Sequence, residues 1–94
     1  MKELRFSEVK DKELRKRRGI GFREIVIEIE AERNLIDVID HPNKKKYPKQ
    51  RMFLVKINNY IYILPFIEET EFIFLKTVYK SRKYTKKYEK AKKL

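Results

Sequence analysis

The sequence of 94 residues predicts an α+β fold in which an antiparallel β-sheet meander is packed by two N-terminal helices and followed by a basic C-terminal helix. Three observations predict this class: an apolar stripe of helical spacing in the first half, three apolar runs between turn residues in the second half, and a final lysine-rich stretch. The length suits one domain over residues 1–94. With 41% apolar residues, 6 Phe and 6 Tyr, the chain is expected to fold.

The first predicted elements are a short strand and a helix with a signal at each end. Leu4 and Phe6 alternate with charged residues, which indicates an edge strand. Ser7 stands where an N-cap is needed, and Gly19 follows the polar stretch Glu8–Arg18 as a C-cap. We therefore expect a helix between these two residues.

The second helix is predicted by apolar residues at i, i+3, i+4 and i+7, the stripe of a helix that faces a core. These residues are Phe22, Ile25, Val26 and Ile29. The helix is expected to run to about Arg33. Residues Leu35–Asp40 are rich in β-branched side chains and lead to the turn signal His41-Pro42-Asn43, so we expect a strand there. Residues 44–50 read as a basic loop.

Three apolar runs form the predicted meander. They are Arg51 to Ile57, Tyr60 to Ile67 and Phe72 to Tyr79. Asn58 and Asn59 suit a two-residue hairpin turn because asparagine tolerates a positive φ. The central run is apolar on both faces, so we expect the helices to cover one face and something else, for example a partner, to cover the other. Pro65 has no amide hydrogen to donate, which indicates a bulge or a sheet edge nearby.

The last predicted helix is cationic with an aromatic side. Ser81 can cap it. Tyr84 and Tyr88 lie on one side of this helix together with Ala91. The remaining surface carries Arg82, Lys83, Lys86, Lys87, Lys90, Lys92 and Lys93.

Positive charge is concentrated in the second half of the chain. The net charge is +11, from 25 Lys and Arg against 14 Asp and Glu. Residues 1–40 contain ten basic and ten acidic residues, whereas residues 41–94 contain fifteen basic and four acidic ones. Such a one-sided field attracts polyanions, and we expect RNA. A solvated lysine surface that serves solubility is the alternative.

Several classes are excluded by what the sequence lacks. It has no cysteine, so disulfides, thiol nucleophiles and cysteine zinc sites are absent. The longest apolar run is far shorter than the roughly 20 residues of a spanning helix, and the N-terminus has no apolar signal region. We expect a cytoplasmic protein with no membrane segment. The few acids of the second half also predict that no metal and no cofactor take part.

Three stretches resemble the BrnT family of bacterial ribonuclease toxins. They are Phe6 with the helix end Lys16-Arg17-Arg18-Gly19-Ile20, then Gly21-Phe22-Arg23-Glu24-Ile25, and finally Ser81-Arg82-Lys83-Tyr84-Thr85-Lys86-Lys87-Tyr88-Glu89. The resemblance implies a RelE-like microbial ribonuclease fold and a toxin of a toxin-antitoxin system that cleaves RNA. It also implies a cognate antitoxin, expected from an adjacent gene, and assembly as a homodimer or a toxin-antitoxin heterotetramer.

Metal-independent cleavage of RNA uses the 2′-OH of the substrate as nucleophile, so the protein must move protons and stabilise the charged phosphorane. We expect Arg51 at the start of the meander and Arg82 and Lys83 at the start of the last helix to converge on one phosphate. His41 is the single histidine, and a neighbouring cationic loop would favour it as a neutral base. A structural role in its turn is the alternative, and Arg82 and Lys83 could equally be ordinary solvated residues.

Further cations and tyrosines are expected to bind the RNA strand around this phosphate. Lysines neutralise phosphates, and tyrosine rings stack on splayed bases. The expected residues are Lys46, Lys49, Tyr79, Lys80, Tyr84 and Lys86. Two other functions remain open: a non-catalytic RNA- or DNA-binding module, and a basic subunit that binds an acidic protein.

Overall fold

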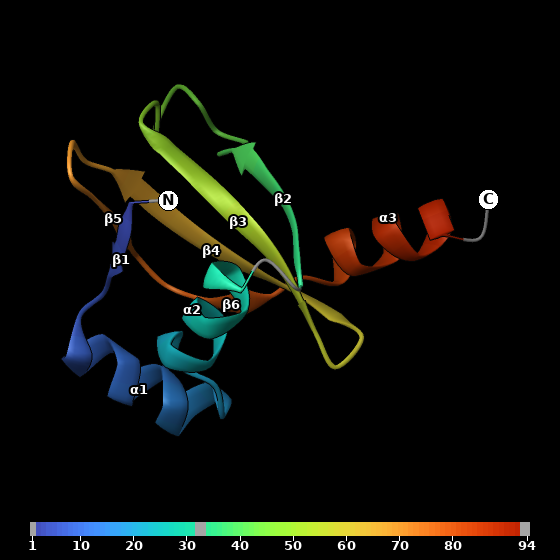
Figure 1. Ribbon diagram of the computed structural model, residues 1–94. Coiled ribbons are helices and arrows are strands. Elements are labelled where there is room, and N and C mark those ends of the chain that lie inside the picture. Colours follow the sequence, from blue (N-terminus) through green and yellow to red (C-terminus); the bar gives the residue numbers. More distant parts are fainter. Residues whose placement is uncertain (1, 32–33, 93–94) are drawn as a thin grey trace.

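The structure, a computed structural model, describes residues 2–31 and 34–92, and within these residues it has three helices and one six-stranded mixed sheet (Figure 1). In chain order the elements are β1 (Glu3–Arg5), α1 (Glu8–Arg18), α2 (Phe22–Glu30), β2 (Leu35–Asp40), β3 (Gln50–Ile57), β4 (Tyr60–Glu68), β5 (Phe72–Leu75), β6 (Tyr79–Lys80) and α3 (Arg82–Lys92). This confirms the α+β class. No helix of the described residues is both long and apolar enough to cross a membrane.

The sheet combines the predicted antiparallel meander with one parallel strand pair. The strand order is β1-β5-β4-β3-β2, and strands β2 to β5 pair antiparallel. β1 pairs parallel with β5, with Glu3 opposite Phe72, and so forms the predicted edge. The prediction of a purely antiparallel sheet is therefore wrong for the pairing of β1. Three residues of alternating sequence indicate a strand but not its partner, which lies far away along the chain.

The last predicted strand, 72–79, is divided into β5 and β6. β5 pairs with β4 from Phe66 to Glu68, and β6 pairs with Tyr62 and Ile63. Between these points the carbonyl of Pro65 accepts a hydrogen bond from Lys76 N at 2.8 Å. Because proline has no N–H, it cannot form a full ladder on that side, and the chain leaves the sheet there.

The signals that act over a few residues are confirmed. Ser7 Oγ accepts a hydrogen bond from Lys10 N at 3.2 Å at the start of α1, and Gly19 ends the helix with φ 72°. Asn58 and Asn59 have φ values of 50° and 66°, and they join β3 to β4. Positive φ at both central residues matches the right-handed twist of the flanking strands.

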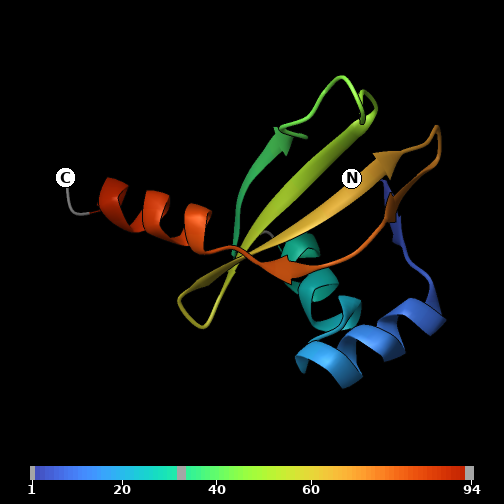
Figure 2. The same cartoon turned by 180° about the vertical axis from the view of Figure 1, so that it is seen from behind.

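Apolar residues are buried on both faces of the sheet. Under α1 and α2 lies a core that includes Phe22, Ile25 and Ile29, each fully buried. On the opposite face a smaller cluster consists of Met52, Leu54, Ile61 and Ile63, packed by Ile39, Tyr84 and Tyr88. The second face, for which a partner was suggested, is thus covered in part by α3, which projects from the sheet away from α1 and α2 (Figure 2). The helix predicted to run to about Arg33 ends earlier, at Glu30, with Ala31 as its C-cap. The side chains of residues 90–94, including Ala91, lie outside the described part.

A buried carboxylate fixes the corner between α1 and α2. Asp11 is 3% exposed, and its Oδ1 accepts a hydrogen bond from Phe22 N at 2.6 Å, at the start of α2. Glu24 Oε2 accepts another from Gly21 N at 3.0 Å. A Cβ atom on Gly21 would lie 2.3 Å from Asp11 Oδ1, so this position needs glycine for space. Arg15 donates to both carboxylates, and its pKa is raised chiefly by the hydrogen bond to Glu24.

Candidate nucleic-acid interface

Lys80 lies between two tyrosine rings of β4. Its Nζ is 5.1 Å from the ring centre of Tyr60 and 5.9 Å from that of Tyr62. The register explains the arrangement, because Lys80 is opposite Tyr62, and residues 60 and 62 share one face of the strand. A cation over an aromatic face is attracted by the ring quadrupole, so lysine and tyrosines hold one another in place.

Two cavities are lined by Lys80 or by the tyrosines it contacts. The first, of about 330 Å³, is lined by Arg18, Ile20, Tyr62, Tyr79 and Lys80. The second, of about 440 Å³, is lined by Asn58, Asn59, Tyr60, Arg82, Thr85, Lys86 and Glu89. Tyr62 thus lines one cavity and Tyr60 the other, and each cavity also contains basic side chains. We call the set Arg18, Tyr60, Tyr62, Lys80, Arg82 and Lys86 the basic edge.

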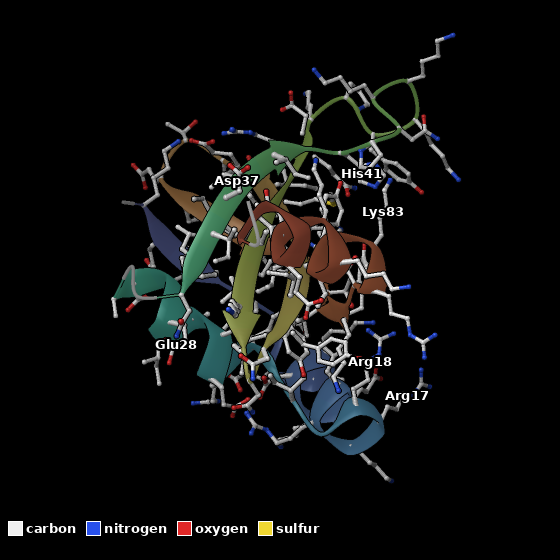
Figure 3. The ribbon with its side chains drawn as sticks, turned by 90° about the vertical axis from the view of Figure 1, so that its right-hand side faces the viewer. Arg17, Arg18, Glu28, Asp37, His41 and Lys83 are labelled. Carbon is white, nitrogen blue, oxygen red and sulfur yellow. The ribbon has the colours of Figure 1, made fainter. Side chains whose placement is uncertain are left out.

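Arg18 joins the basic edge from the other end of the sequence. Its guanidinium donates a hydrogen bond to the backbone carbonyl of Val78, immediately before β6. Figure 3 shows Arg17 and Arg18 projecting to the same side of the molecule as Lys83. The site predicted from the sequence omits these arginines, because the charge of the first forty residues sums to zero. The run of four basic residues at the end of α1 is the signal that could have found them.

The start of α3 is fixed to the start of β4. Ser81 N donates to Ile61 O at 2.9 Å, and Ser81 Oγ caps the helix by accepting from Tyr84 N at 3.1 Å. Thr85 Oγ1 accepts from Ile61 N at 2.9 Å and donates to Ser81 O at 2.6 Å. These bonds fix the backbone at the start of α3, where the exposed Arg82 lines a cavity together with Tyr60.

The tyrosines differ in how far their rings are exposed. Tyr60 is 40% exposed and Tyr79 is 36% exposed, whereas Tyr62 is buried at 8%. Tyr84 packs on the apolar cluster beneath α3, and Lys83 Nζ lies 5.7 Å from its ring centre. Burial, and to a lesser degree Tyr84, raises the pKa of Tyr79, so its hydroxyl stays protonated near neutral pH. Tyr60 is therefore the most accessible ring of the basic edge.

The structure does not bring Arg51 and Arg82 together. Arg51 is the second residue of β3 and lies opposite Phe66, while α3 is attached at Ile61, five residues away along β4 or about 17 Å at the usual rise. The alternation of β3 also places Arg51 on the α1 and α2 face, whereas α3 packs on the other. Arg51 Nε is 3.5 Å from Asp40 Oδ1. The predicted convergence of these two arginines on one phosphate is therefore corrected.

The surroundings of Arg51 are those of a surface ion-pair group. Hydrogen bonding and charge attraction from Lys44 lower the pKa of Asp40, and Arg51 adds to the effect. Lys2 lowers the pKa of Glu68 in the same way, again with a smaller contribution from Arg51. Arg51 thus lies beside two carboxylates that stay charged and that it shares with Lys44 and Lys2.

His41 belongs to the 41–50 loop at the same end of β3. Its Nδ1 accepts a hydrogen bond from Asn43 N at 3.0 Å, and its ring is 4.5 Å from that of Tyr47. Since Nδ1 is an acceptor, the neutral ring carries its proton on Nε2 and can donate to an anion. Lys46 and Lys49 are exposed in this loop. The residues predicted for one site are consequently divided between the basic edge and this loop.

The chemistry within reach of the basic edge is anion binding and hydrogen-bond donation. In the part of the chain that the structure describes, no group of three or more His, Cys, Asp or Glu side chains could hold a metal ion. No protein-family model, curated protein or solved structure matches this chain.

Proposed function

We propose that this protein binds single-stranded RNA along the basic edge. The observation that carries the proposal is Lys80, which lies over the rings of Tyr60 and Tyr62: Tyr62 lines a cavity with Lys80 and Arg18, and Tyr60 lines a second cavity with Arg82. Alternating cations and aromatic rings suit a strand whose phosphates bind the cations and whose bases stack on the rings. A single strand is favoured because a base must be unpaired to stack on Tyr60.

We further propose that the protein cleaves this RNA as a metal-independent endoribonuclease toxin of the BrnT kind, with a RelE-like fold. The support is the sequence resemblance together with the element order, which has the strand, two helices, strands and final helix that the resemblance implies, with β6 in addition. Arg82 and Lys83, at the start of α3, would stabilise the phosphorane. The attacking 2′-OH would give its proton to solvent water, and Tyr79 would protonate the leaving 5′-oxygen and recover its own proton from water, since its hydroxyl stays protonated near neutral pH.

The partner proposed for the inactive state is a cognate antitoxin encoded by an adjacent gene. An acidic segment of the antitoxin would cover the basic edge, where the charge is complementary. The two chains would form a heterotetramer in the cytoplasm, or the toxin alone a homodimer. Antitoxin and RNA would then compete for Lys80 and Arg82.

A binding module without catalysis is the second candidate. It is favoured by the separation of Arg51 and His41 from Arg82, which leaves fewer groups for proton transfer beside the bound phosphate.

One experiment separates the two candidates. A defined single-stranded RNA is incubated with the protein in EDTA, and the products are analysed for 2′,3′-cyclic phosphate ends. The proposed ribonuclease yields such ends at fixed positions, and the Arg82→Ala/Lys83→Ala variant loses them. The Lys10→Ala/Lys12→Ala variant is the matched control, because it removes the same charge from the first half of α1. RNA binding without cleavage products would support the non-catalytic binding module. The absence of RNA binding would contradict both candidates.

A further inference from the structure

The 41–50 loop is a second cationic site, and internal contacts give it a defined shape. Asn43 Oδ1 accepts from Lys46 N at 3.2 Å, Asn43 O accepts from Tyr47 N at 2.9 Å, and Tyr47 O accepts from Gln50 N at 3.2 Å. Lys46 Nζ lies 5.3 Å from the centre of the Tyr47 ring, which also contacts the His41 ring. The loop thus presents cations beside two aromatic rings, as the basic edge does.

The loop and the basic edge are separated by the length of the sheet. Gln50 closes the loop opposite Ile67, whereas Lys80 is opposite Tyr62. These points are five residues apart on β4, or about 17 Å at the usual rise per residue. One phosphate cannot reach both sites, so the lysines of the loop cannot serve the same phosphate as Arg82.

The two sites nevertheless open to the same side of the molecule. Figure 3 shows Arg17 and Arg18 at one end of this side, His41 at the other, and Lys83 between them, extended toward the His41 end. The acidic neighbours of the loop are occupied: Asp40 binds Lys44 at 2.8 Å, and Glu68 binds Lys2 at 2.8 Å. Lys45, Lys46 and Lys49 are exposed, and their charges are available to an anion.

We infer that the 41–50 loop is a separate RNA-binding site, and that an RNA strand long enough to extend from the basic edge to the loop binds both at once. The inference rests on the proposed function, since it assumes that RNA occupies the basic edge. His41 Nε2–H and the lysines bind phosphates of the distant part of the strand, and Tyr47 is fixed beside them. The substrate class is therefore single-stranded RNA above a minimum length.

Binding at two linked sites has a measurable signature. Once one part of the strand is bound, the other part is held at high effective concentration near the second site, and the overall affinity rises without any new interaction at the first. A strand too short to reach both sites gains no such affinity. Affinity should therefore rise steeply at the length that spans the two sites.

The test measures fluorescence anisotropy with 2′-O-methyl RNA, which lacks the nucleophile for cleavage, at lengths of about 4, about 8 and about 16 nucleotides. The variant Lys45→Ala/Lys49→Ala removes two exposed charges that take no part in the internal contacts of the loop described above. We expect it to weaken binding of the longest strand roughly tenfold and of the shortest strand less than about twofold. The slope of log affinity against log salt should become shallower by about 0.7 for each phosphate that the variant no longer neutralises.

Two controls complete the test. Lys10→Ala/Lys12→Ala makes the same charge change on α1, at the opposite end of the molecule from the loop (Figure 1), and should leave every length unaffected. Arg18→Ala/Lys80→Ala should weaken binding of the shortest strand as well as of the longest. If that variant has no effect, the proposed function fails. If it weakens all lengths while the loop variant binds the longest strand like the wild type, only the two-site inference fails.

A protein ligand at the loop would also overturn the inference. Its signature would be a loop variant that keeps full affinity for the longest RNA but loses binding of a polyglutamate peptide, which is tested in the same assay.

Discussion

The α1–α2 corner and the basic edge contain the same kinds of residue in opposite electrostatic settings. At the corner, Arg15 binds Asp11 and Glu24, and Arg23 binds Glu8 at 2.6 Å. At the basic edge, Lys80 faces tyrosine rings and Arg18 donates to a backbone carbonyl. Rings and carbonyls hold a cation in place without cancelling its charge.

This difference shows why the net charge of a stretch of sequence does not by itself predict which cations form a binding surface. The charges of the first forty residues sum to zero, yet Arg18 contributes to the basic edge because its guanidinium faces a backbone carbonyl and not a carboxylate. Arg51 lies in the basic half but faces the carboxylate of Asp40. What decides the role of a cation is the group it faces in the fold.

The largest effect is a loss of stability, expected when the hydrogen bond between α1 and α2 is removed. Asp11→Ala should lower the free energy of unfolding by about 2–3 kcal/mol, because it leaves the buried N–H of Phe22 without its acceptor. Asp11→Asn keeps the acceptor and should cost less. Urea unfolding followed by circular dichroism measures both. RNA affinity of the folded variants should equal that of the wild type, and a loss of affinity without a loss of stability would assign Asp11 to binding.

A smaller effect is expected from changing the accessible ring of the basic edge. Tyr60→Leu should weaken RNA binding about tenfold, or about 1.4 kcal/mol, since stacking of one base contributes roughly 1–3 kcal/mol. Tyr60→Phe keeps the ring and should bind nearly as the wild type. Anisotropy titrations compare the two at fixed salt. Equal loss in both variants would mean that the hydroxyl, and not stacking, interacts with the RNA.

The smallest effect concerns the ion pairs around Arg51. The pKa values of Asp40 and Glu68 are lowered in the folded protein, so their contribution to stability is full above their ordinary pKa values, about 3.9 and about 4.3, and is lost as pH falls through the lowered values. The Asp40→Asn/Glu68→Gln variant should therefore lose less stability than the wild type between pH 7 and pH 3. Urea midpoints measured at both pH values provide the check. If the variant and the wild type lost the same stability between the two pH values, these ion pairs would contribute nothing to folding.

The elements of the fold could be predicted where a few neighbouring residues decide the structure. Ser7 and Gly19 mark the two ends of α1, and the pair Asn58 and Asn59 marks the hairpin. The apolar spacing that starts at Phe22 identifies the buried face of α2. In each case the physical cause, a cap, a positive φ or a periodic face, lies within one turn or one hairpin.

The remaining features depend on contacts between distant residues. No local property of β1 shows that it pairs with β5, and only the meeting of Pro65 and Lys76 shows why β5 and β6 are separate strands. Arg18 and Arg51 look alike in the sequence. The first meets a carbonyl sixty residues away and the second a carboxylate on the neighbouring strand. For this reason the sequence predicted the kinds of residue in the site better than their grouping.

The parallel pairing of β1 with β5 has a consequence for biosynthesis. Residues 3–5 have no strand to join until residues 72–74 have left the ribosome, and Arg18 has no carbonyl to hold it until Val78 follows. Contacts of such long sequence separation form late in folding. The arginines of α1 and the tyrosines of β4 therefore form one surface only after Lys80 has also left the ribosome.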